Sequence, residues 1–454
     1  MSARTSNMLA AAIPGVFFIL CSAWGARLLG AESSAAIALI TLGMTVCGAV
    51  AFLMLSSLRV AGTARRCAAF FIPVLVLLLL RMAVFNYQTL DYQDFLARWT
   101  QYFRTHGGIA AIGANVGNYN VPYLVFLAIC SYLPVSELYL IKIFSVFFDL
   151  VLAWALAKMV RRVTGSEIRT GLCFVVTLLL PTVYLNGALW GQCDSVYSSL
   201  ALLSIALVLE KKPVRAMIAA GVAFAFKLQA IFVLPMFAAF LFTGRIKWYH
   251  LPIFPAAYLA AVSPAIIAGR GFWDTVLTYL SDASTIGGGL NYNSPSVFAF
   301  IYNVSDADRA GKVGMLVSFL ICAIMIIVVI IRRKRVGDLE LVVATAVLAI
   351  GVPLFLPHMH DRYFFLADAS ALAVAFCVPK LAAAVPLTSF ASLLGYHAYL
   401  RMRYLLPMKY GFFALFVALV MLIAYFFVRV WRKNERKIEA AEAPEREADR
   451  HNNI

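Results

Sequence analysis

Two histidines, an aspartate and an arginine lie close together where a long apolar run ends. His358, His360, Asp361 and Arg362 directly follow Pro357. An ionisable side chain beside hydrocarbon is costly unless it is paired or hydrated, so such a group is a candidate functional site. A single arginine could simply extend to the membrane surface. The clustering of four polar residues instead favours a site that binds an anion or exchanges protons.

The composition defines the setting in which this cluster works. Of the 454 residues, 63% are hydrophobic and only 13% are charged, which no soluble chain of this length would tolerate. Apolar stretches of roughly 15 to 24 residues recur and match a hydrocarbon thickness of ~30 Å, and spanning segments must be helices. We therefore expect an all-α polytopic membrane protein with about fourteen spans. The expected spans are near 8–29, 35–57, 68–86, 139–158, 171–188, 195–209, 214–227, 228–242, 250–268, 313–331, 339–356, 363–379, 382–399 and 410–430.

The net charge of +16 is explained by basic residues in the loops between spans. Basic clusters fall on alternate loops, as the positive-inside rule requires of cytoplasmic ones, so both termini are expected in the cytoplasm and no nucleic-acid partner is implied. The eight cysteines show no CxxC spacing, which suggests neither a disulfide framework nor a zinc site. The basic clusters are Arg59/Arg65/Arg66, Lys158/Arg161/Arg162/Arg169, Lys211/Lys212/Arg215, Arg332/Arg333/Lys334/Arg335 and Arg429/Arg432/Lys433.

The unusual polar residues all fall on the other, non-cytoplasmic side of this topology. Such convergence of segments that are distant in sequence predicts a shared site. The residues concerned are Asp91, Asp94, Asn118, Tyr119, Asn120, Trp190, Gln192, Asp194, Lys227, Gln229, Asn291, Asn293, His358, His360, Asp361, Arg362, Arg401 and Arg403.

Four residues in this set could carry specific chemistry. Asp91 and Asp94 precede an amphipathic stretch, 95–104, that we expect to lie along the interface. A carboxylate near lipid can serve as a general base, although either Asp could instead cap the helix. Asp194 has the same capping alternative. Lys227, between two short apolar segments, needs an anionic partner, and phosphate is a good candidate.

Other segments indicate organisation more than chemistry. Asp149 falls in the middle of a span and is expected to bond to a neighbouring helix as a structural residue. Residues 121–134 are too short to cross and are expected to be re-entrant or interfacial. We divide the chain into a two-span N-terminal extension, a membrane core, C-terminal spans and a charged cytoplasmic tail. Their bounds are 1–67, 68–380, 381–430 and 431–454.

Ordered motifs in this chain resemble those of the GT-C glycosyltransferases that use polyprenyl-phosphate sugars, above all bacterial relatives of the second mannosyltransferase of GPI-anchor assembly. The resemblance covers roughly residues 68–380. Its motifs are Asp91-Tyr92-x-x-Phe95-Leu96-x-x-Trp99 with Gly107-Gly108; Asn118-Tyr119-Asn120-x-Pro122-Tyr123; Trp190-Gly191-Gln192-x-Asp194 with Phe226-Lys227-x-Gln229 and Pro235; and Leu356-Pro357-x-Met359-His360-Asp361-Arg362-Tyr363.

The resemblance implies a reaction and roles for the residues. A hexose, with mannose favoured, would pass with inversion from a polyprenyl-phosphate donor to a glycan or glycolipid hydroxyl, and Asp91 would be the base. Lys227, His360, Arg362, Arg401 and Arg403 would bind the donor phosphate. Most of the other polar residues of the set would contact substrate: Asp94, Tyr119, Asn120, Trp190, Gln192, Asp194, Gln229, Asn291, Asn293, His358 and Asp361.

No metal or other cofactor is expected, because the cations can stabilise the leaving phosphate and no carboxylate cluster has clear metal spacing. A transporter or flippase of a lipid-linked sugar, or a lipid-linked glycan ligase or polymerase, stays open as an alternative. Short loops favour a bacterial inner membrane, within the cell envelope, with the site on the periplasmic side. The sugar, the acceptor and the oligomeric state stay open.

Overall fold

In a computed structural model, helices make up nearly all of the regular structure of the residues that are described, 3–31, 33–279, 289–301 and 306–432. The exception is one pair of two-residue strands. The prediction of an all-α polytopic membrane fold is confirmed. The predicted charged tail falls, from residue 433 onward, outside the described residues.

Eight helices in the described part of the chain are long and apolar enough to cross a membrane. A helix pair bent by 52° makes a ninth if it is counted as one span. That pair is α7 (Glu167–Leu179) followed by α8 (Pro181–Tyr184) and η3 (Leu185–Trp190). The eight are α1 (Ala3–Leu28), α2 (Ser34–Ser57), α6 (Glu137–Thr164), α12 (Ile253–Ile267) with η5 (Trp248–His250), α15 (Ala307–Ile331), α16 (Asp338–Phe355), α18 (Ala384–Leu400) with η7 (Pro379–Leu381), and α19 (Lys409–Arg432).

The expected number of about fourteen spans is therefore too high. Three expected windows form helices too short to cross alone, since even a helix of 16 residues extends only roughly 24 Å. Most side chains of the first and the third of these helices, and half of those of the second, are buried inside the bundle, so their apolar character is largely that of a protein core. These helices are α9 (Asp194–Leu209), α10 (Pro213–Phe226) and α17 (Phe365–Cys377).

Two more windows differ from expectation for other reasons. The window 68–86 corresponds to α3 (Ala64–Met82), a helix that carries three arginines and is not among the eight. The window 228–242 is not one helix, because a turn containing Pro235 separates η4 (Leu228–Phe232) from α11 (Met236–Phe242). Proline lacks the N–H that a continuing helix requires.

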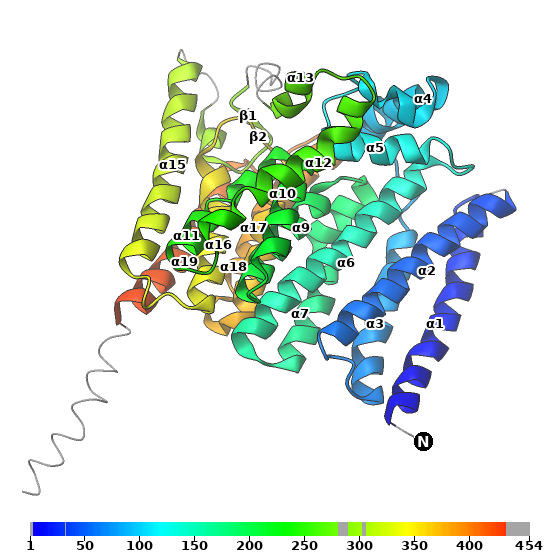
Figure 1. Ribbon diagram of the computed structural model, residues 1–454, viewed down its shortest axis with the longest axis horizontal. Helices are drawn as coiled ribbons and strands as arrows, with labels where there is room; N and C mark the ends of the chain where they lie inside the picture. Colours follow the sequence, from blue (N-terminus) through cyan, green and yellow to red (C-terminus); the bar gives the residue numbers. More distant parts are fainter. Residues whose placement is uncertain (1–2, 32, 280–288, 302–305, 433–454) are drawn as a thin grey trace, which may run out of the picture.

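The bundle has two different ends, which are visible in Figure 1. The loops after α6 and α15 and the end of α19 lie at one end. The short elements of the long loops lie at the opposite end, and α5 is too short to cross, as predicted for residues 121–134. These short elements are η1 (Tyr92–Leu96), α4 (Ala97–Thr105), η2 (Gly108–Gly113), α5 (Val121–Cys130), α13 (Phe272–Val276), β1 (Asn291–Tyr292), η6 (Val297–Phe300) and β2 (Met359–His360).

The strand pair connects two loops that are remote in sequence. Strands β1 and β2 are parallel, with Tyr292 opposite His360, and Asn293 forms a further bridge to His360. This pairing holds the loop after α13 against the turn between α16 and α17. It thereby fixes the backbone of His360 next to the aromatic ring of Tyr292.

A buried ion pair joins α3 to α6. Arg81 Nε lies 3.2 Å from Asp149 Oδ2, both side chains are fully buried, and Arg81 also donates to the carbonyl of Leu178 at 2.8 Å. The expectation that Asp149 bonds to a neighbouring helix is thus confirmed. Its partner, Arg81, was not foreseen from the sequence.

Candidate active site

Four breaks between helices bring the candidate site together at the end of the bundle that carries the short elements. Asp91 directly precedes η1, and Trp190 ends η3 just before α9. Lys227 lies in the extended link between α10 and η4, and Arg362 lies in the turn between α16 and α17. Backbone breaks of this kind present side chains that a continuous helix would direct elsewhere. The structure therefore brings together residues that lie more than 250 positions apart in the chain.

The Asp91 carboxylate is held by hydrogen bonds to one of its two oxygens. Trp190 Nε1 donates to Asp91 Oδ2 at 3.0 Å, and Gln192 Nε2 donates to the same oxygen at 2.6 Å. The backbone N–H of Asp91 donates to the hydroxyl of Tyr399 at 2.9 Å, and the Tyr399 ring stacks on Trp190. The side chain of Asp91 makes no capping hydrogen bond to η1. The carboxylate is thus oriented by side chains from two other segments.

Arg362 is the electrostatic centre of the site. Its guanidinium lies 3.7 Å from Asp91 Oδ2, 3.5 Å from Asp194 Oδ2 and 3.4 Å from Asp361 Oδ1. The guanidinium carbon also lies 5.5 Å from the centre of the Trp190 ring. Burial lowers the pKa of Arg362, but Tyr119 and these three carboxylates outweigh it and raise the pKa well above its ordinary value. The arginine therefore stays charged and connects the candidate base to the rest of the site.

Lys227 pairs with the buried Asp194, whose carboxylate also accepts a hydrogen bond from Asn186 Nδ2 at 2.9 Å. The Lys227 ammonium lies between two tyrosine rings, 5.6 Å from that of Tyr197 and 5.4 Å from that of Tyr363. Asp194 is the first residue of α9, but both of its oxygens are occupied by side chains. Its main contacts are therefore with the site, and the capping alternative receives no support from them.

These cations border a cavity of about 430 Å³. Lys227 and Arg362 line one part of it, and His360, stacked on Tyr292 with ring centres 4.6 Å apart, lines another. Gln229 also lines the cavity, and its amide oxygen has no hydrogen-bond donor among the described residues. The full lining is Asn118, Tyr119, Asn120, Cys193, Phe226, Lys227, Leu228, Gln229, Tyr279, Tyr292, His360, Arg362 and Tyr363.

Two neighbours of Arg362 have displaced pKa values. Burial, together with the charges of Arg362 and Lys227, lowers the pKa of His360 to about 3, so its imidazole is neutral at pH 7. It would therefore meet a phosphate as a hydrogen-bonding group rather than as the cation expected from the sequence. Burial raises the pKa of Asp361 to about 7, and the nearby Asp91 and Asp194 act in the same direction while Arg362 opposes them.

Several predicted residues lie at the site but contact other protein groups. Gln192 is almost fully buried, and its amide oxygen accepts a hydrogen bond from Tyr119 at 3.1 Å. Asn120 accepts a hydrogen bond from the N–H of Val121 at the start of α5. Asp94 lies away from the cavity, half-exposed, in an ion pair with Arg98 at 3.1 Å.

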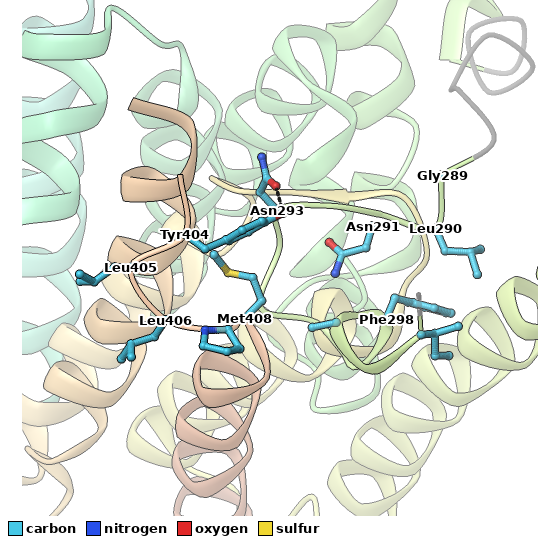
Figure 2. A pocket seen from close by; sticks show the side chains of 12 residues that line it. Gly289, Leu290, Asn291, Asn293, Phe298, Tyr404, Leu405, Leu406 and Met408 are labelled. Atoms are coloured by element: carbon cyan, nitrogen blue, oxygen red, sulfur yellow. Dashed lines mark hydrogen bonds between the residues drawn. The ribbon is translucent and has the colours of Figure 1, made fainter. Parts of the chain in front are cut away.

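The other predicted residues surround a second cavity or lie near it. Asn291 and Asn293 line the pocket of Figure 2 and not the cavity that His360 lines. His358 Nδ1 lies 2.8 Å from the carbonyl oxygen of Gly289. Arg401 and Arg403 are exposed on the turn after α18, and they do not line the cavity that Lys227 borders. These two arginines thus do not share a cavity with Lys227, His360 and Arg362, the other residues predicted to bind the donor phosphate.

The sequence did not predict three residues that contact the predicted site residues or one another. Tyr399 and Tyr396 come from α18, and Asn186 comes from η3. Tyr396 accepts a hydrogen bond from Asn186 at 3.1 Å and packs edge-on against Trp190. The only signal in the sequence was a Tyr-x-x-Tyr spacing near the end of an apolar segment, which places both side chains on one helix face. Among the described residues, no group of three or more His, Cys, Asp or Glu side chains could hold a metal ion.

The described residues thus form a polytopic helical membrane protein in which Lys227 and Arg362 line a cavity and Arg362 also contacts the Asp91 carboxylate. The family model of glycosyltransferase family 87 matches residues 118–357, more than half of the chain. The chain therefore belongs to glycosyltransferase family 87, a GT-C-like family, and is a membrane glycosyltransferase. No curated protein matches the chain. Asp91 precedes the matched range and Arg362 follows it.

Proposed function

We propose that this glycosyltransferase moves a hexose from a polyprenyl-phosphate donor to a hydroxyl of a glycan or glycolipid, on the non-cytoplasmic face of the membrane. Mannose is the favoured hexose, because the ordered motifs resemble those of the bacterial relatives of the second mannosyltransferase of GPI-anchor assembly. The observation that supports the proposal most is the position of Arg362, which contacts the Asp91 carboxylate on one side and borders the cavity on the other.

Asp91 is the proposed base. The donors Trp190 and Gln192 both bind Oδ2, so Oδ1 is the oxygen that would take the proton from the acceptor hydroxyl. The hydroxyl oxygen then forms a bond to the anomeric carbon while the bond from that carbon to the phosphate oxygen breaks. The lipid phosphate leaves with the bonding electron pair, and attack from the opposite face inverts the anomeric configuration.

The leaving phosphate is the group that the cations would stabilise. Lys227 and Arg362 both line the cavity, and each is oriented by the same buried carboxylate, Asp194. Cations that are already oriented cost little reorganisation when negative charge develops on the phosphate. His360 can donate one hydrogen bond as a neutral imidazole. The free amide oxygen of Gln229 is available to a hydroxyl of the sugar.

The test is transfer by the purified full-length protein. It would be incubated with a panel of polyprenyl-phosphate hexoses and candidate acceptors, and release of the polyprenyl phosphate would be followed. We expect one hexose to be turned over in preference to the others, with mannose the first choice. Release with none of the hexoses would overturn the choice of donor class, while family membership would stand.

The Asp91→Asn variant tests the base. We expect it to bind the donor with unchanged affinity and to lose roughly 100- to 10,000-fold in kcat, because an amide cannot accept the proton. The matched control is Asp274→Asn, an exposed carboxylate on α13 at the same end of the bundle, which should keep the wild-type rate. Transfer by Asp91→Asn at the wild-type rate would remove Asp91 from the mechanism. A transporter would still move its solute in this variant.

Metal independence is part of the same proposal. Lys227 and Arg362 provide positive charge where other glycosyltransferases would require a divalent ion. We expect transfer to continue at an unchanged rate in excess EDTA. Loss of activity in EDTA that added Mg²⁺ or Mn²⁺ restores would show that a metal ion takes part.

A further inference from the structure

A second cavity, of about 520 Å³, lies beside the catalytic site and is not used in the mechanism above. Figure 2 shows it between a wall that includes Leu290 and Phe298 and a wall formed by the turn from Tyr404 to Met408. Its lining is mixed, with amide and hydroxyl groups from Asn291, Asn293 and Tyr404 next to aliphatic and aromatic side chains. Such a lining suits an amphiphile, which has one polar part and one apolar part.

The backbone around β1 separates this cavity from the catalytic one. Asn293 forms a bridge to His360, whose ring lines the catalytic cavity, and the hydroxyl of Tyr404 donates to the side-chain oxygen of Asn293. The two cavities share no lining residue. A ligand in the second cavity would therefore be a neighbour of the sugar donor and would not compete with it for the same contacts.

The second cavity lies at the ends of candidate membrane spans. Its turn, 404–408, follows the end of α18 and leads directly into α19. Large apolar side chains are exposed along this turn, among them Met402 at 72% and Leu405 at 64%. Apolar exposure at the end of a span is stable when the residues are immersed in the boundary region of a bilayer. The cavity is thus within reach of lipid headgroups.

The charge of the same turn is entirely positive. Arg401, Arg403 and Lys409 are exposed, and the segment 401–410 contains no acidic residue. Pro407 and Met408, which line the cavity, directly precede the first residue of α19. The start of a long helix favours an anion through its free N–H groups and its dipole. A phosphate at this position would meet cationic side chains and a helix N-terminus together.

We infer that the second cavity binds an anionic phospholipid of the surrounding bilayer. The lipid phosphate lies near Arg401, Arg403 and the start of α19. The part of an acyl chain next to the headgroup lies against Phe298, Leu405 and Met408. Mixed lining, apolar exposure at the ends of spans and a turn whose charged residues are all basic fit this ligand, and they fit a zwitterionic lipid less well. The inference does not rest on the proposed reaction, because lipid binding requires no sugar donor.

The probe is phosphatidylglycerol, with phosphatidylcholine as the zwitterionic comparison, added to the full-length protein and followed by native mass spectrometry. We expect phosphatidylglycerol to be retained on the wild-type protein at least about tenfold more tightly than phosphatidylcholine. The double variant R401Q/R403Q should lose most of this preference. The matched control, R333Q/K334Q, removes two charges at the opposite end of the bundle and should retain it.

A second variant distinguishes binding in the cavity from binding to a charged surface. Ala299 is buried and lines the cavity, so Ala299→Leu reduces its volume without changing any charge. We expect this variant, with its melting temperature measured to confirm folding, to bind phosphatidylglycerol more weakly as well. Equal losses in R401Q/R403Q and R333Q/K334Q, full retention in Ala299→Leu, or displacement of the lipid by millimolar inorganic phosphate alone would each overturn the inference.

Discussion

The side-chain amide of Gln192 orients the Asp91 carboxylate. Gln192 donates to Asp91 with its nitrogen and accepts from Tyr119 with its oxygen, so its orientation is determined at both ends. Tyr119 in turn lines the cavity. These two hydrogen bonds connect Tyr119, in the cavity wall, to the proposed base. Gln192 therefore acts as a positioning residue, through Asp91.

The variant Gln192→Glu tests this role. It places a second carboxylate 2.6 Å from Oδ2 in a buried setting, where two carboxylates retain a shared proton. We expect low transfer at neutral pH, and a pH–rate curve displaced upward by roughly one unit or more. The control Gln93→Glu adds the same charge on an exposed position near Asp91 and should leave the curve unchanged. An undisplaced curve in Gln192→Glu would mean that the amide does not act on the base.

The sequence predicted which residue types meet at the site, but not what each one touches. The motif containing Trp190, Gln192 and Asp194 was expected to contact substrate. In the structure, all three side chains are buried and contact Asp91, Lys227 or Arg362. A sequence cannot distinguish a residue that faces a ligand from one that faces the residue beside it, because the partners come from segments whose packing is not yet known.

Asp361 and His360 should change stability with pH in opposite directions. The pKa of Asp361 is raised from 3.8 to about 7, so its contribution to stability is fully present below pH 4 and is lost as the pH rises through 7. The pKa of His360 is lowered from 6.5 to about 3, so its contribution is present above pH 6.5 and is lost as the pH falls toward 3.

Melting temperatures between pH 4 and 7.5 check these directions. Relative to the wild-type protein, we expect Asp361→Asn to gain stability as the pH rises, and His360→Gln to gain stability as the pH falls. Each variant removes one titrating group, so the difference from wild type isolates that group. Two curves parallel to that of the wild-type protein would contradict both assignments.

At the scale of elements, the site residues lie where helices are interrupted. The chain breaks at Lys227, where the backbone is extended, and again near Pro235. Hydropathy located every one of these apolar segments, yet it overestimated the number of spans. Apolar windows look alike whether a helix faces lipid or other helices, and only packing shows that α9, α10 and α17 lie inside the bundle.

The ion pair between Arg81 and Asp149 joins α3 to α6, and its contribution to the stability of the protein can be measured. Arg81→Met leaves the Asp149 carboxylate buried and unpaired, which we expect to cost about 3–5 kcal/mol. The double variant R81M/D149L removes both charges and should recover much of this loss. The control Lys312→Met breaks an exposed pair with Asp308 and should change the melting temperature little. A double variant no more stable than Arg81→Met would contradict the pairing.

At the scale of the whole molecule, the basic clusters and the proposed catalytic cavity lie at opposite ends of the bundle. The basic end is crossed by ion pairs between helices, such as Arg162 with Asp338 at 2.7 Å and Arg429 with Glu340 at 3.1 Å. The catalytic cavity lies at the opposite end, among the short elements. The positive-inside rule predicts that the basic end faces the cytoplasm and that the cavity faces the other side. The division into an extension, a core and C-terminal spans remains a prediction.

The orientation of the whole bundle can be measured by labelling single cysteines. In a variant without the eight native cysteines, Thr105→Cys lies at the end of α4, and Lys334→Cys lies in the loop after α15. Both positions are exposed. In right-side-out vesicles, an impermeant maleimide should label Thr105→Cys at once and Lys334→Cys only after permeabilisation. The reverse pattern would place the cavity in the cytoplasm, where a nucleotide sugar could serve as donor, and labelling of both from outside would mean that the basic and catalytic ends do not lie on opposite sides of the membrane.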